Sequence, residues 1–170
     1  MESLIFHPKV VHLPIALGVL MPLIAASLAL AWWRSFLPKR AWLVAVALQT
    51  MLVLSGFVAM RTGEAEEGKV EPIVGESVLE AHEEAAEAFV WTSAAVLLLF
   101  VGAAILRREG ASLALAVAAT IGTLVVFGLG YRTGEAGGSL VYEHGAASAY
   151  TSPGEGSPAP AYRGDHEDHD

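Results

Sequence analysis

The chain has 170 residues, of which 54% are hydrophobic and only 16% are charged, against roughly 25% charged residues in soluble domains. With a mean hydropathy of +0.52 and a formal net charge of −8, the composition indicates a membrane protein and argues against nucleic-acid binding. The absence of cysteine excludes disulfides, iron–sulfur clusters, c-type haem attachment and thiolate metal sites within the chain.

Four apolar segments follow one another along the chain and predict transmembrane helices at about residues 10–33, 41–60, 85–106 and 111–131. Each comes close to the ~20 residues that an α-helix needs to cross the hydrocarbon core of a bilayer. None alternates apolar and polar residues in the manner of a β-barrel strand. The sequence therefore predicts an all-α integral membrane protein, with a four-transmembrane-helix bundle over residues 1–146.

The segments between these helices differ in charge. Two short connections, at residues 34–40 and 107–110, are basic, whereas every acidic residue except Glu109 lies on the other side of the predicted bilayer. The positive-inside rule places the basic connections in the cytoplasm and both termini outside. On the outer side, residues 64–75 predict a loop, and Gly63 and Gly134 suit left-handed helix C-caps. Residues 147–170 are rich in Pro, Gly, Ser and charge and predict a disordered tail.

An internal repeat relates the two halves of the chain. The segment RTGEA at residues 61–65 recurs at residues 132–136, and each copy closes an apolar run. His12 precedes Arg61 by 49 residues, and His82 precedes Arg132 by 50 residues. Such a period predicts a bundle built from two repeated helical hairpins that face each other across a pseudo-twofold axis.

The repeated histidines suggest a cofactor site near the outer surface. Two neutral imidazoles on opposing helices are what a six-coordinate haem b needs as axial ligands, so His12 and His82 are candidate ligands of haem iron. Arg61 and Arg132 could pair with the haem propionates through charge-assisted hydrogen bonds. The alternative interpretation is that each histidine hydrogen-bonds a helix end or a loop carbonyl.

A second interpretation uses overlapping residues as a metal site. The candidate ligands of zinc, copper or non-haem iron are His12 and His82 together with His7, His144, Glu64 and Glu135. No pair among them has a tight spacing on one helix, so the sequence favours haem over this site. The two glutamates could instead form a salt-bridge network with the repeated arginines that ties the hairpins together. Because no nucleophile lies beside a base, the sequence predicts an electron carrier or accessory subunit rather than a catalyst.

Three segments resemble a bacterial membrane family known as domain of unknown function 2231. Residues 7–16 read HPKVVHLPIA and are similar to the family's opening His-Pro and Val-His-Phe-Pro-Ile-Ala. His82 is similar to its mid-chain histidine, and residues 137–145, GGSLVYEHG, resemble its ending. The resemblance implies a four-helix bacterial membrane protein with histidines gathered at one face. Some relatives are joined to cytochrome-type modules, which favours redox work.

These observations predict a b-type haem protein of the bacterial inner membrane that transfers electrons near the periplasmic face. Its partners would be the lipid bilayer and a periplasmic cytochrome or a larger respiratory complex, and a homo-oligomer with haem between protomers is equally compatible. Two alternatives stay open. One is a non-enzymatic accessory or docking subunit of a membrane complex, and the other is a metal-binding membrane protein with its site on the periplasmic side.

Overall fold

The computed structural model describes residues 7–150 of the chain. These residues form helices joined by short connections, and no strand occurs among them. In chain order the elements are α1 (His7–Val10), α2 (His12–Trp33), the 3₁₀ helix η1 (Lys39–Ala41), α3 (Trp42–Glu64), α4 (Glu67–Val74), α5 (Glu76–Ile105), α6 (Glu109–Tyr142) and the 3₁₀ helix η2 (Ala146–Tyr150). Most of the predicted tail, residues 151–170, lies outside the described residues, whereas residues 147–150 belong to η2.

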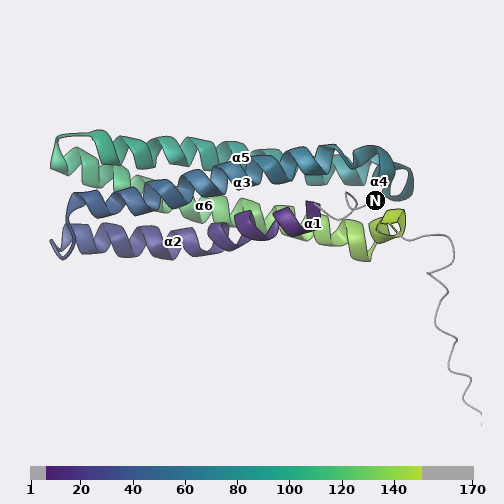
Figure 1. Cartoon of the computed structure of the whole chain (residues 1–170), viewed down its shortest axis with the longest axis horizontal. Coiled ribbons are helices and arrows are strands. Elements are labelled where there is room, and N and C mark those ends of the chain that lie inside the picture. The colour runs from purple at the N-terminus through teal and green to yellow at the C-terminus, as the bar shows by residue number, and fades with distance from the viewer. Residues whose placement is uncertain (1–6, 151–170) are drawn as a thin grey trace, which may run out of the picture.

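Four of these helices, α2, α3, α5 and α6, are long and apolar enough to cross a membrane. They lie side by side along the length of the molecule (Figure 1). α2 packs against α3 and α6, and α5 packs against the same two helices, so α2 and α5 lie on one diagonal of the bundle. The predicted all-α membrane bundle is confirmed. The chain forms an α2/α3 hairpin and an α5/α6 hairpin, while their relation as structural repeats stays a prediction.

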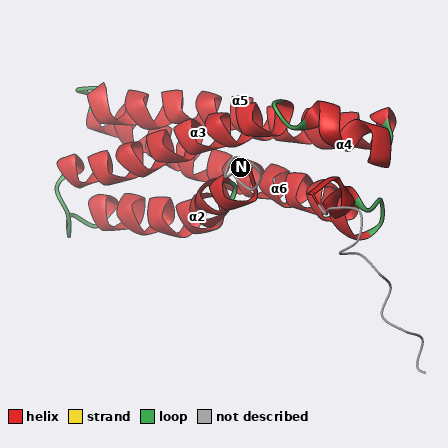
Figure 2. Cartoon of the chain, turned by 45° about the vertical axis from the view of Figure 1, so that its right-hand side comes forward, coloured by secondary structure: helices red, strands yellow, loops and turns green. Residues whose placement is uncertain are grey.

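The two ends of the bundle differ in length and charge. We call the end formed by residues 34–41 and 106–109 the basic end, and the end formed by residues 61–87 and 132–150 the acidic end. α5 has 30 residues and α6 has 34, which makes them about 45 Å and about 51 Å long. A hydrocarbon core is about 30 Å thick, so α5 and α6 are longer than a membrane crossing requires. Their outer turns continue past α2 and α3 at the acidic end, where α4 and η2 pack together (Figures 1 and 2).

Phe89 of α5 fills the centre of the bundle beside a glycine from each of the other three helices. A Cβ atom built on Gly18 of α2, Gly56 of α3 or Gly130 of α6 would lie 3.7, 3.4 or 3.2 Å from the Phe89 ring. The ring itself is buried. In a bilayer, where helices associate through close packing, small residues of this kind let the helices approach one another.

Polar side chains of α3 link the two hairpins inside the bundle. Trp42 Nε1 donates a hydrogen bond to the Phe100 carbonyl oxygen at 3.1 Å, and the Trp42 and Phe100 rings stack with centroids 4.9 Å apart. Gln49 Nε2 donates to the Ser93 carbonyl oxygen at 3.0 Å. Both acceptors belong to α5, so the first hairpin is tied to the second through backbone carbonyls.

The structure corrects two local expectations at the acidic end. The predicted loop at residues 64–75 contains α4, whose Val74 is buried. Gly63 and Gly134 do not cap helices, because Gly63 lies in the last turn of α3 and Gly134 lies inside α6. The left-handed positions are instead Gly75, with φ +85°, and Gly145, with φ +71°. Each of these glycines adjoins the end of a helix, where the missing Cβ makes a positive φ accessible.

Candidate functional site

The two repeated histidines lie at similar heights near the acidic end. α2 and α5 both run from the acidic end to the basic end, and Gly18 of α2 packs against Phe89 of α5. His12 precedes Gly18 by six residues and His82 precedes Phe89 by seven. Along their helix axes, the two histidines therefore lie about 9 Å and about 10 Å from that contact, toward the acidic end. The diagonal helices α2 and α5 therefore carry the histidines at one level of the bundle.

His82 is held against the neighbouring helix α6. The side chain is half-buried, and a Cβ atom built on Gly137 would lie 3.1 Å from His82 Cε1 and 3.5 Å from Nδ1. One turn further into the bundle, Thr133 Oγ1 donates to the Ala85 carbonyl oxygen at 2.9 Å. The absence of a side chain at Gly137 thus creates the space in which the imidazole lies.

His12 and the two repeated arginines have more exposed positions. His12 is exposed in the first turn of α2. Arg61 is also exposed; its Nη1 lies 3.0 Å from Glu64 Oε2, and its guanidinium lies 5.1 Å from the centre of the Phe57 ring. Arg132 is exposed on α6 and makes no ion pair with another residue in the range 7–150. The Arg61–Glu64 ion pair therefore lies within one helix and does not tie the two hairpins together.

The remaining predicted ligands are spread over the acidic end. His144 Nδ1 lies 3.2 Å from the Ser139 carbonyl oxygen, and the His144 backbone N–H donates to the same oxygen. His144 therefore follows the alternative interpretation, in which a histidine closes a helix end. Glu135 is exposed on α6, and His7 begins α1, which packs against α3. Within residues 7–150, no group of three or more His, Asp or Glu side chains is arranged to hold a metal ion.

Two of the three segments with a family resemblance lie at the acidic end and meet where His82 packs against Gly137, and the third, residues 7–16, covers α1 and the start of α2. The sequence profile of a family described as "Predicted membrane protein (DUF2231)" matches residues 4–149. The chain belongs to the DUF2231 family. No curated protein and no solved structure matches it.

The closing segment of this DUF2231 protein has structural roles that the sequence alone did not reveal. Leu140 is buried in a small apolar cluster with Val74, Leu79 and Ala146, which joins α4, α5, α6 and η2. Gly145 supplies a left-handed residue after α6. The i, i+4 spacing of Val70 and Val74 is the one signal in the sequence that could have predicted this cluster. Tyr142, in contrast, is 90% exposed and takes no part in it.

Several glutamates lie close to one another around the part of α5 at the acidic end. Glu83 is half-buried, and its carboxylate lies in the field of four other glutamates. These are Glu64, Glu67, Glu80 and Glu87. The acidic end of this DUF2231 protein therefore combines a packed histidine with a concentrated negative charge.

Proposed function

We propose that this DUF2231 protein is a b-type haem electron carrier whose redox site lies at the acidic end. The observation that carries the proposal is that His12 and His82 occupy one level on diagonally placed helices. At this level the other two helices supply glycines, since Gly63 follows Gly56 by seven residues and Gly137 follows Gly130 by seven. Two imidazoles at one level of a helix bundle, with glycines on the other two helices, are a donor set that suits a macrocycle.

The two histidines fit this role to different degrees. His82 is half-buried beside Gly137, whereas His12 is exposed in the first turn of α2. Ligation by His12 therefore requires this turn to reorient, and helix ends are the parts of a helix that open most easily. Arg61 and Arg132 are exposed at the same end, and their guanidinium groups would be the partners of the propionates. When bound, the haem would supply one-electron redox chemistry.

The other residues of the acidic end support the same role. The buried Phe89 ring packs between the helices about 10 Å further into the bundle than the histidines. The glutamates around Glu83 give the surface a negative field, which would steer a basic partner such as a periplasmic cytochrome. The positive-inside rule supports an inner-membrane orientation with the acidic end in the periplasm.

The orientation can be tested directly because the chain has no cysteine. Ser148 and Ser35 are exposed at the acidic and basic ends. We expect a membrane-impermeant maleimide to label Ser148→Cys in intact spheroplasts and to label Ser35→Cys only after lysis. The reverse pattern would place the acidic end in the cytoplasm and contradict the periplasmic site.

The haem assignment is tested by a reduced-minus-oxidised absorption spectrum of protein purified from haem-replete cells. We expect a b-type signal that His82→Ala abolishes and that His12→Ala converts to a five-coordinate spectrum. His144→Ala is the matched control, because this side chain bonds its own helix end and should leave the spectrum unchanged. A flat wild-type spectrum, or an unchanged spectrum in both ligand variants, would overturn the proposal.

A second candidate function, an accessory or docking subunit, is favoured by the exposed tyrosine of the closing segment. Tyr142 is 90% exposed although Leu140, two residues earlier, is buried. Aromatic side chains are enriched at the centres of protein interfaces. For this function we expect the wild-type protein to co-purify with a larger membrane complex and to hold no cofactor. We expect Tyr142→Ser to abolish this co-purification. Elemental analysis of the same preparation would reveal zinc, copper or non-haem iron and so test the metal-binding alternative.

A further inference from the structure

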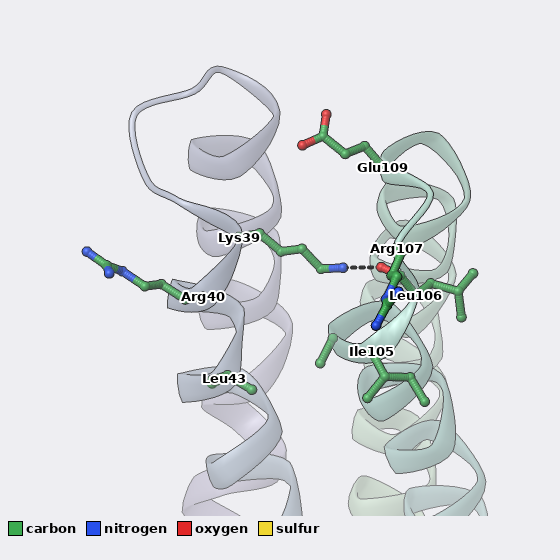
Figure 3. Close-up of a pocket in the computed structure, with 8 residues that line it drawn as sticks. Lys39, Arg40, Leu43, Ile105, Leu106, Arg107 and Glu109 are labelled. Atoms are coloured by element: carbon green, nitrogen blue, oxygen red, sulfur yellow. Dashed lines mark hydrogen bonds between the residues drawn. The ribbon is translucent and has the colours of Figure 1, made fainter.

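The basic end contains a hollow of about 460 Å³ between the α2–α3 connection and the α5–α6 connection (Figure 3). The basic residues in its lining are Lys39 and Arg40 on one side and Arg107 on the other, and the side chains of Lys39 and Arg107 supply its positive charge. Glu109 is the acidic residue in its lining, and Leu43 and Ile105 contribute apolar surface. A concave site with a positive excess and an apolar wall is suited to an amphipathic anion.

Lys39 spans the two connections and is fixed by a hydrogen bond. Its Nζ donates to the Leu106 carbonyl oxygen just after α5 ends, as the dashed line in Figure 3 shows. The ammonium also lies 5.8 Å from the centre of the Trp32 ring. Since an ammonium carries three N–H donors, the bond to Leu106 leaves others for an anion in the hollow.

The surroundings reinforce the positive potential at this point. Arg107 extends beside the Lys39–Leu106 bond, whereas Arg40 points away from the hollow on the opposite side (Figure 3). The 34-residue helix α6 begins at Glu109, so the positive end of its dipole also lies here. Arg34 and Arg108 belong to the same two connections but do not line the hollow.

The hollow lies at one end of the membrane-crossing helices, where lipid headgroups are expected. The membrane-crossing helices α2 and α5 end at Trp33 and Ile105, next to it. Trp residues near helix ends are typical of the membrane interface. Ile105 is 70% exposed and Leu43 is 56% exposed, so apolar walls adjoin the cations on the side where acyl chains would lie.

We propose that this hollow binds the phosphate group of an anionic phospholipid, with Lys39 and Arg107 on the phosphate and acyl chains along Leu43 and Ile105. Free phosphate has the same charge chemistry but makes no use of the exposed apolar wall. Basic pockets between transmembrane helices on the cytoplasmic side are a general means of holding such headgroups. The site is separate from the proposed haem site and does not depend on it.

The test measures lipid binding to the full-length protein in detergent by native mass spectrometry. The probes are phosphatidylglycerol, phosphatidylcholine and inorganic phosphate. We expect discrete binding of phosphatidylglycerol, weakened about fivefold in Arg107→Gln because one interfacial charge is lost. Arg108→Gln is the matched control: it removes the same charge from the next residue, outside the hollow, and should change binding less than twofold.

Three results would overturn the proposal. Equal weakening by the two arginine variants would show unspecific attraction by the basic end. Equal binding of phosphatidylglycerol and phosphatidylcholine would show that the phosphate charge is not recognised. Displacement of the lipid by millimolar inorganic phosphate would identify a site for the free anion instead. A thermal unfolding curve of Arg107→Gln that matches the wild type is the check that the variant is folded.

Discussion

The two hairpins of the bundle share sequence landmarks but pack in different ways. Within the α5/α6 hairpin, three glycines of α6, Gly122, Gly130 and Gly137, face side chains of α5, and a Cβ atom on Gly122 would lie 2.7 Å from Val96 Cγ2. In the α2/α3 hairpin, Gly18 and Gly56 instead face Phe89 of the other hairpin. In the second hairpin the glycines thus allow its own two helices to pack together, whereas in the first hairpin they accommodate a side chain from the second hairpin.

The copies of the repeated segment RTGEA also end in different surroundings. The first copy finishes α3, which ends at Glu64, whereas the second lies inside α6, which continues to Tyr142. The continuation of α6 brings Leu140 into the cluster with Val74 and Leu79. The comparison teaches that the same local sequence can end or continue a helix, depending on whether apolar partners lie beyond it.

Phe89→Ala is the substitution expected to have the largest effect, because it breaks the contact between the hairpins. Removing a buried phenylalanine leaves a cavity and typically lowers the free energy of unfolding by about 3–5 kcal/mol. Phe127→Ala is the matched control, since Phe127 is 44% exposed on the outside of α6 and should lower it by less than about 1 kcal/mol. Unfolding by SDS in mixed micelles measures both. Equal losses would show that Phe89 does not join the hairpins.

Gly122→Ala tests the closure of the second hairpin alone. The added methyl group would meet the stiff Val96 side chain at 2.7 Å, and such overpacking typically lowers stability by about 1–3 kcal/mol. Gly128→Ala, where no atom lies within 4 Å of the new Cβ, should be neutral or stabilise by about 0.5–1 kcal/mol because alanine has the better helix propensity. The same unfolding assay compares them. If Gly128→Ala were the more harmful change, the assigned face of α6 would be wrong.

Glu83→Gln is expected to have the smallest effect and the opposite sign. Removing the charge at the centre of the four other glutamates relieves repulsion and should stabilise the protein by about 0.2–0.5 kcal/mol. Glu109→Gln at the basic end, next to Arg107 and Arg108 in the sequence, should give no such gain. The difference should shrink in high salt. A destabilised Glu83→Gln variant would mean that this carboxylate serves as a needed acceptor.

The positions of the candidate site residues along their helices could be predicted from the sequence, but their contacts could not. The position of His82 near the start of α5 follows from the apolar run that begins at Phe89, because both belong to one helix. Its packing against Gly137 could not be predicted, since the two residues lie on different helices and their heights depend on the register of the hairpin. The exposure of His12 likewise depends on which face of α2 meets α3 and α6.

The sequence by itself determined the four spans and the separation of charge between the two ends. The reason is that crossing an apolar core needs about 20 consecutive apolar residues, a requirement that each segment meets or fails alone. The tertiary structure decided which helices are neighbours, how far α6 continues, and where Lys39 reaches across to Leu106 to line the basic hollow. These features arise from contacts between distant segments, whose small residues set how closely the helices approach.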